Sequence, residues 1–324
     1  MARRSAIAAI LIAALFAGCG DDDGSGSGSG SGDRPTVSVA LDFTPNPVHA
    51  PIYTAVREGL DRQEGVRLRI RPPGSRPDSL KLVLSGRADL AVLDIHDLAL
   101  ARERGVDAVA VGALVQKPLG ALIAQPSVAH PRDLNGKRIG VSGLPSDPAF
   151  VRAILEDDGG DYGSVDEITI GFNAVASLLG RKVDAVPVFW NVEGVILRER
   201  GRSFREFRVE DYGAPAYPEV VLVTTRGVLS RRRADLERAV AALRRGVEAT
   251  LDDPDAAASE IARASGGTDL RLVRAQLDAL RPVVTPPLRM GRGVVEEWAR
   301  WDAQVGIVER PVDVRRAFDF GVAR

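Results

Sequence analysis

Polar and aromatic side chains gather in the segment that follows the first predicted strand. Residues 41–50 contain Asp42, Phe43, Asn46 and His49, and two prolines restrict the backbone between them. An Asn amide offers donors and an acceptor, which suits the edge of a heteroaromatic ring. A structural interpretation fits equally well, in which Asn46 caps the following helix and His49 packs in its first turn. The segment is a candidate ligand-binding segment.

A second candidate segment follows a predicted strand at residues 183–188. If a helix begins near Trp190, residues 190 and 193 share a face, so an aromatic ring lies beside the carboxylate of Glu193. Such a pair can stack on a flat ring and accept hydrogen bonds from its amino group. The alternative places Trp190 in the core and makes Glu193 a favourable charge at the helix N-terminus.

Four weaker candidates lie in other loops and strand ends: Asp94, His96, Ser142 and Tyr217. Ser142 starts a loop whose amides can receive an anionic group, although a turn with a helix cap explains it as well. His96 is equally well explained as a helix-start residue. The three histidines lack a metal-binding spacing, and no phosphate loop or nucleophile elbow occurs in a strand–helix context. We therefore predict no metal, no cofactor and no catalytic residue.

Alternating strands and helices must position these residues. Strands are expected at residues 36–42, 66–71, 89–93 and 106–114, and again at 138–141, 168–172, 183–188 and 220–224, with helical segments between most of them. The chain is mainly helical from residue 230 onward. This order predicts an α/β protein with parallel pairing and two lobes, joined by crossings near residues 113–124 and 217–225. Ligands bind outside the carboxyl ends of such strands, so the cleft between the lobes is the expected site.

Composition excludes several classes of protein. The 324 residues include 43 Lys and Arg against 44 Asp and Glu, which argues against a nucleic-acid partner because such a protein needs a basic face. The single cysteine excludes an intramolecular disulfide, a multi-cysteine zinc site and a cysteine-ligated cluster. We expect a monomer.

The first 34 residues have the pattern of an export signal and a tether. Arg3 and Arg4 precede an apolar run, and small residues lead to Cys19, which resembles a bacterial lipoprotein signal. We predict a signal peptide at 1–18, a lipidated Cys19, and a flexible Asp/Gly/Ser tether at 19–34. The protein is then exported and anchored by lipid to the outer face of the cytoplasmic membrane. Lobe 1 is expected at 35–118 and 224–324, and lobe 2 at 119–223.

Several segments together are similar to the solute-binding proteins of ABC importers, in the branch that binds pyrimidine precursors of thiamine and includes related pyrimidine synthases. The similarity covers roughly residues 36–260, and its more specific stretches are Leu41-Asp-Phe-Thr-Pro-Asn-Pro-Val-His49 and Trp190-Asn-Val-Glu193. The pattern in Asp133-Leu-Asn-Gly-Lys-Arg-Ile-Gly-Val141 recurs among solute-binding proteins generally, and Tyr217-Pro-Glu-Val-Val-Leu-Val223 extends the similarity. Phe43 stands where this branch usually has Trp.

The resemblance implies a type II periplasmic binding fold that closes on a small heterocycle and delivers it to a permease with its ATPase. It implies that Asn46, His49, Trp190 and Glu193 approach an aminopyrimidine. Alternative ligands are riboflavin, a sulfonate or another small nutrient. A synthase-like enzyme is a further alternative, which the single Cys and the export signal disfavour because the related synthases use a Cys-rich motif and an intracellular cofactor.

Overall fold

The computed structural model describes residues 34–74, 78–144 and 146–324. The predicted signal peptide, Cys19 and nearly all of the tether lie outside these residues. The described part forms one compact unit from Arg34 onward. None of its helices combines the length and the apolar character that crossing a membrane would require.

Five strands form the first sheet in the order β2-β1-β3-β10-β4. Strand β1 runs parallel to β2 and β3, whereas β10 runs antiparallel to β3 and β4. The strands are β1 Thr36–Ala40, β2 Arg67–Arg71, β3 Leu90–Asp94, β4 Val109–Ala113 and β10 Val220–Thr224. The helical segments before β4 are η1 Pro47–His49, α1 Ala50–Arg57, α2 Leu60–Gln63, α3 Ser79–Leu84 and α4 Ile95–Glu103. Those after β10 are α8 Arg226–Asp252, α9 Pro254–Ala264, α10 Leu270–Leu280, η6 Arg281–Val283, α11 Arg292–Gln304 and α12 Val314–Ala317.

The second sheet has the strand order β7-β6-β8-β5-β9. Strand β6 runs parallel to β7 and β8, and β5 runs antiparallel to β8 and β9. The strands are β5 Gly120–Ala124, β6 Arg138–Val141, β7 Asp166–Thr169, β8 Ala185–Phe189 and β9 Arg205–Arg208. The accompanying segments are η2 Pro131–Leu134, α5 Asp147–Asp157, η3 Tyr162–Ser164, α6 Ala174–Leu179, the π-turn η4 Trp190–Gly194, α7 Val195–Glu199 and η5 Val209–Tyr212.

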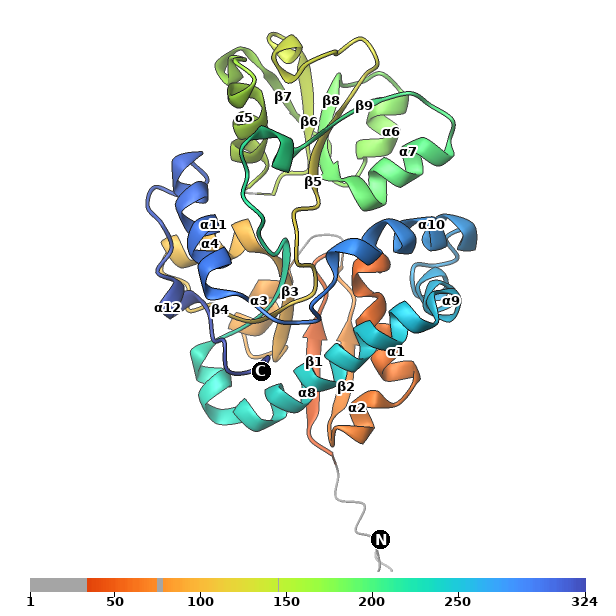
Figure 1. Cartoon of the computed structure of the whole chain (residues 1–324), viewed down its shortest axis with the longest axis vertical. Helices are drawn as coiled ribbons and strands as arrows, with labels where there is room; N and C mark the ends of the chain where they lie inside the picture. The colour runs from red at the N-terminus through yellow and green to blue at the C-terminus, as the bar shows by residue number, and fades with distance from the viewer. Residues whose placement is uncertain (1–33, 75–77, 145) are drawn as a thin grey trace, which may run out of the picture. The chain divides into compact units, whose positions relative to one another are not determined.

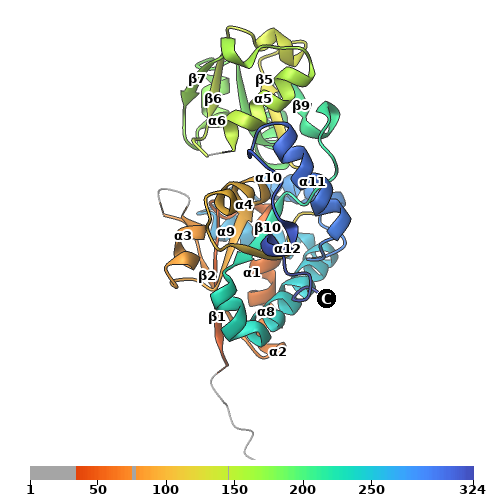
Figure 2. The same ribbon diagram turned by 90° about the vertical axis from the view of Figure 1, so that its left-hand side faces the viewer.

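Two α/β lobes joined by two crossings are therefore confirmed, as Figures 1 and 2 show. The crossings run from β4 to β5 and from η5 to β10. Both sheets mix parallel and antiparallel strands, where we expected parallel pairing alone.

The structure differs from prediction at both crossings. We expected residues 113–124 to connect the lobes, but the last five form β5 in the interior of the second sheet, where each residue is buried. We also ended the second lobe at residue 223, but Val220 already pairs with Asp94 in the first sheet. Strand β9, in the charged stretch Arg205–Arg208, was not predicted either. The remaining lobe boundaries stay a prediction.

Strand β10 returns to the first sheet because its side chains are apolar on both faces. Val220 and Leu222 belong to the core that contains helices α1 and α8. Val221 and Val223 face the opposite core, which contains residues of α4 and α11. A strand between two neighbours and covered on both faces has to be a continuous apolar run.

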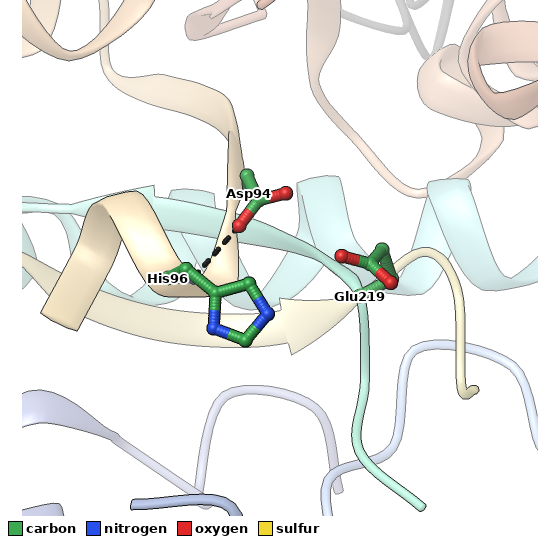
Figure 3. Close-up of side chains that lie close together, drawn as sticks. All are labelled: Asp94, His96 and Glu219. Carbon is green, nitrogen blue, oxygen red and sulfur yellow. Dashed lines mark hydrogen bonds between the residues drawn. The ribbon is translucent and has the colours of Figure 1, made fainter. Parts of the chain in front are cut away.

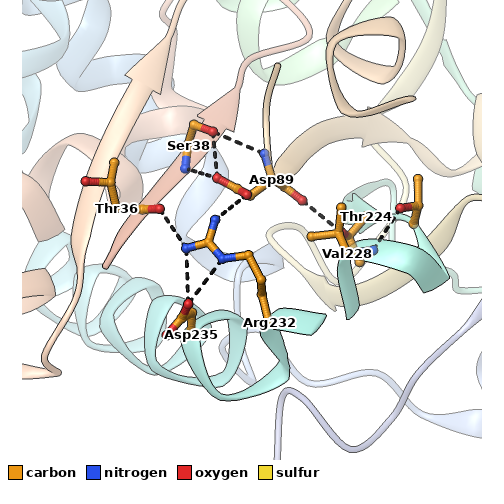
Figure 4. Close-up of polar contacts among 8 residues, drawn as sticks. Thr36, Ser38, Asp89, Thr224, Val228, Arg232 and Asp235 are labelled. Carbon is orange, nitrogen blue, oxygen red and sulfur yellow. Dashed lines mark hydrogen bonds and ion pairs between the residues drawn. The ribbon is translucent and has the colours of Figure 1, made fainter. Parts of the chain in front are cut away.

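A polar network fastens the start of α8 to the far end of the first sheet (Figure 4). Asp89 accepts hydrogen bonds from the backbone and hydroxyl of Ser38, each at 2.7 Å, and pairs with Arg232. Arg232 also donates to the Thr36 carbonyl at 2.8 Å and to Asp235 at 3.1 Å. The network joins β1, the start of β3 and α8 at the end of the sheet opposite the strands' carboxyl ends.

Helix α8 packs closely along α1 because residue 246 is a glycine. A Cβ added at Gly246 would lie 2.2 Å from the Pro51 carbonyl oxygen and 3.0 Å from the Ala55 Cβ. The backbone oxygen cannot move without moving α1, so this position has no room for a side chain.

Gly246→Ala should lower the free energy of unfolding by about 1–3 kcal/mol, the usual cost of overpacking a core. Gly293→Ala is the matched control, because Gly293 is helical and a Cβ there meets nothing within 4 Å. The control should be neutral or more stable by about 1 kcal/mol, since Ala favours helix over Gly. Urea unfolding of both variants measures the difference, and equal stability would contradict the packing argument.

Candidate functional site

A cavity of about 600 Å³ lies at the carboxyl ends of the strands, and both lobes contribute to its walls. Eight of the ten predicted ligand-binding residues line it: Asp42, Phe43, Asn46, His49, Asp94, His96, Ser142 and Glu193. Trp190 and Tyr217 do not line it. The cavity is large enough for a small heterocycle.

Asn46 and His49 have a local structural role as well as a place at the cavity. The Asn46 side chain accepts a hydrogen bond from the Val48 amide at 2.9 Å and so caps η1. The backbone N–H of Asn46 donates to His49 Nδ1 at 3.2 Å, which leaves the proton on Nε2 to be donated to Asp42 at 2.8 Å. The capping interpretation is confirmed, and it holds the Asp42 carboxylate at the cavity wall.

Glu193 lies in the π-turn that follows β8. Its side chain lines the cavity, and no ion pair of this carboxylate occurs among the described residues. Burial raises the pKa of Glu193 to about 7, against the opposing effect of hydrogen bonds with its own backbone and that of Phe189. A carboxyl group held away from water without a counter-charge costs free energy unless a partner satisfies it.

Trp190 lies in the core instead of stacking in the cleft, so our expectation of an aromatic plane beside Glu193 is wrong. Its indole is buried, Nε1 donates to the Pro118 carbonyl at 3.2 Å, and the Arg208 guanidinium lies 4.2 Å from the ring centroid. The reason is the π-turn, which is wider than an α-turn and separates residues three apart around the helix axis.

Tyr217 and His96 form a buried polar cluster behind the cavity. The ring nitrogens of His96 contact Asp302 at 2.8 Å and the Tyr217 hydroxyl at 3.1 Å. Tyr217 is fully buried and stacks on Trp301, which removes it from the cleft. Burial alone would lower the pKa of His96, but the carboxylates of Asp302, Asp94 and Glu219 raise it to about 10. His96 is therefore a buried cation that holds α4, α11 and a crossing together.

Asp94, His96 and Glu219 lie close enough to hold a metal ion, with one donor atom each within 4.8 Å (Figure 3). Both nitrogens of His96 already face protein partners, so the imidazole has no free lone pair to offer. Burial raises the pKa of both Asp94 and Glu219, and the charge of His96 acts in the opposite direction on both. The carboxyl groups of Glu219 and Asp97 raise the pKa of Asp94 further. The two acids share a proton more readily than they bind a cation.

The acidic residues of the cavity that were not predicted include Asp97, Asp147 and Glu219. Asp97 follows His96 in the first turn of α4, and Asp147 follows the loop that contains Ser142. Glu219 directly precedes β10 in the segment that also contains Tyr217. All three are polar residues in segments that adjoin a strand, which could have identified them. The sequence analysis named residues of the same segments, His96, Ser142 and Tyr217, in their place.

The cavity is acidic and is bridged at one point by an aromatic contact. Its lining has two basic side chains, Lys81 and Arg104, besides the two histidines, and the carboxyl groups of Asp42, Asp78, Asp94, Asp97, Asp147, Glu193 and Glu219. Phe43 of the first lobe meets Phe172 of the second edge to face, with ring centroids 4.4 Å apart. Such walls suit a flat ligand that is neutral or cationic and rich in N–H donors.

Comparison with known proteins agrees with this geometry. The sequence profile of the family described as NMT1/THI5 like matches residues 46–257. The chain is 32% identical over 225 residues to the formylaminopyrimidine-binding protein of Halalkalibacterium halodurans, with 68% of each chain covered. It is 24% identical over 260 residues to a 4-amino-5-hydroxymethyl-2-methylpyrimidine phosphate synthase of Uromyces fabae, with 75% of this chain and 74% of that one covered.

Solved structures share the fold at low sequence identity. The ligand-binding component of an ABC-type import system from Staphylococcus aureus has a TM-score of 0.71 at 15% identity, covering 89% of this chain and 98% of that one. The alkanesulfonate-binding protein of Xanthomonas axonopodis pv. citri has a TM-score of 0.70 at 17% identity, covering 88% and 98%.

Compared with wild type, Glu193→Gln should be more stable at pH 8 than it is at pH 5. The folded-state pKa of about 7 exceeds the ordinary value of 4.5. The contribution of Glu193 to stability is therefore fully present below pH 4.5 and is lost as the pH rises through 7. The variant should gain about 1–3 kcal/mol over wild type between pH 5 and pH 8, at about 1.4 kcal/mol per pKa unit. Urea unfolding at both pH values measures this.

Glu156→Gln is the control, because Glu156 is exposed on α5 and does not line the cavity. If the free energy of unfolding changes between pH 5 and pH 8 by the same amount in Glu193→Gln and Glu156→Gln, burial does not raise the pKa of Glu193.

Proposed function

The chain belongs to the NMT1/THI5-like family, and from that membership and the cleft we propose that it is the solute-binding component of an ABC importer. It captures a small aminopyrimidine, a precursor of the pyrimidine half of thiamine, and presents it to a membrane permease with its ATPase. The named relative that binds formylaminopyrimidine supports this ligand class.

The Glu193 carboxyl group is the observation that carries the proposal. It lines the cavity, and burial raises its pKa to about 7. An aminopyrimidine presents an amino group beside a ring nitrogen, so a carboxyl group can accept one hydrogen bond from the amine. A second hydrogen bond joins the Glu193 carboxyl group to the ring nitrogen. Its proton can belong to either of these two groups. The ligand thereby adds polar partners to the backbone hydrogen bonds that Glu193 already has.

Closure of the two lobes on the ligand follows from where the contacts originate. Asp42 and Asn46 lie in the first lobe, whereas Glu193 lies in the second, so one ligand can contact both. A ligand shifts an open–closed equilibrium only if it binds the closed state better, and contacts from both lobes have that effect.

We propose binding without catalysis. The chain has one cysteine, Cys19, which lies outside the described residues, so the cleft has none of the thiols of a Cys-rich site. Export by the signal at residues 1–18 and lipid attachment at Cys19 would hold the binding lobes at the outer face of the cytoplasmic membrane. The protein acts as a monomer in this proposal.

Thermal unfolding of residues 33–324 with a ligand panel tests the ligand class. Formylaminomethyl- and hydroxymethyl-aminopyrimidine should raise the unfolding temperature, since a ligand at 100 times its Kd adds about 2.7 kcal/mol. Riboflavin, taurine and an alkylsulfonate should leave it unchanged. A shift with riboflavin or a sulfonate and none with the pyrimidines would retain the transport role and reject this ligand.

Glu193→Gln should weaken aminopyrimidine binding about ten- to hundred-fold, because a hydrogen bond to a charged group contributes about 1.5–3 kcal/mol. Isothermal titration measures the affinity, and Glu156→Gln should bind as wild type does. Equal affinity in Glu193→Gln and wild type would remove Glu193 from the site.

Phe172→Ala should weaken ligand binding about two- to ten-fold, because the edge-to-face contact with Phe43 joins the lobes and such pairs contribute about 0.5–1.5 kcal/mol. Phe172 is 45% exposed, so the stability of the unliganded protein should change little. Leu270→Ala is the control, since Leu270 is 48% exposed and lies outside the cavity. If both variants bind equally well, the aromatic contact does not contribute to closure.

A further inference from the structure

The loop between β6 and α5 directs its backbone amides at a carboxylate of the protein itself. One oxygen of Asp147, Oδ2, accepts hydrogen bonds from the amides of Ser142 at 2.7 Å, Gly143 at 3.0 Å and Leu144 at 3.3 Å. The Ser142 hydroxyl donates to the same oxygen at 2.7 Å. All four of these residues line the cavity.

Amides that converge in this way, next to the N-terminus of an eleven-residue helix, form a favourable environment for an anion. Here the anion is internal, because the Asp147 side chain is almost fully buried and occupies the donors. Of the two interpretations of the Ser142 loop, the one in which its amides receive an anionic ligand does not fit this arrangement. A sulfonate or phosphate entering the cleft would find these donors already used.

The facing wall of the cavity gives an independent indication of the ligand. Asp97 of the first lobe lines the same cavity, and its buried Oδ1 has no hydrogen-bond partner among the described residues. Burial raises the pKa of Asp97 to about 6, with Asp147 and Asp42 adding to the rise and His96 and Ser146 opposing it. This wall lacks an N–H or O–H donor for one acceptor, and a sulfonate group, which has neither, cannot supply that donor.

We propose that Asp147 is a specificity-determining residue, whose carboxylate fills the 142–144 loop as a built-in anion and so excludes sulfonates, sulfate and phosphate esters from the cleft. Ligands are then limited to neutral or cationic molecules with donor groups. The inference rests on the proposed function only in taking this cleft as the ligand site, and it holds for any ligand that binds there.

Asp147→Ala tests it directly, because the variant frees the loop donors and removes one negative charge. Isothermal titration with methanesulfonate should show at least ten-fold tighter binding to Asp147→Ala than to wild type, which should not bind measurably. Asp147→Asn keeps an oxygen that can accept from the loop amides, so it should gain much less. Asp97→Asn removes the same charge from the cavity and leaves the loop filled, so it should not gain.

Two outcomes would overturn the inference: measurable methanesulfonate binding to wild type, or an equal gain in Asp97→Asn and Asp147→Ala, which would indicate a general effect of charge. If Asp147→Ala does not fold alone, methanesulfonate should restore its folding and sodium chloride of equal ionic strength should not. Failure of both binding and rescue also rejects the inference. Aminopyrimidine titration of wild type in parallel reports on the proposed function separately.

Discussion

The carboxylate of Glu219 joins the two crossings, and the position of each lobe depends on this contact. Glu219 lies at the end of the second crossing, and its Oε2 accepts hydrogen bonds from the amides of Leu119 at 2.5 Å and Gly120 at 3.2 Å, where the first crossing enters β5. Hydrogen bonds from amides to a carboxylate are among the strong ones in proteins. Both connections between the lobes are therefore joined at Glu219.

Placing this acid in the interior costs free energy, which neighbouring groups offset. The buried cation His96 faces Glu219, Asp94 and Asp302, and it links α4 to α11 through Asp302. Removing one member of such a cluster leaves uncompensated buried charge, which is far more costly than the net contribution of the cluster. Glu193 and Asp97 line the cavity and form no ion pair among the described residues, whereas Glu219 accepts two backbone amides and Asp302 contacts His96.

The sequence allowed the two-lobed α/β architecture to be predicted, because most strands are apolar runs separated by helical segments. It did not reveal β5, whose five buried residues have no alternation to distinguish a strand from a connection. In the site, Glu193, Asn46 and His49 line the cavity, and their contact with a ligand stays a prediction. Trp190 and Tyr217 do not line it, which the sequence did not reveal because an aromatic side chain at a strand end suits a core as well as a ligand, and the π-turn that directs Trp190 inward depends on tertiary packing.

The charge of the groups in the cleft can determine whether this fold binds an anionic ligand or a neutral or cationic one. The strand ends and helix N-termini of an open α/β lobe supply backbone amides, which favour anions wherever they are free. In this chain Asp147 occupies the amides after β6 and Glu219 those at the start of β5, so backbone donors in two places are satisfied from within. The carboxyl groups of Asp97 and Glu193 are among those that remain at the cavity wall. In our proposal, a few carboxyl groups that fill these backbone positions or leave them open determine the ligand class, while the fold stays the same.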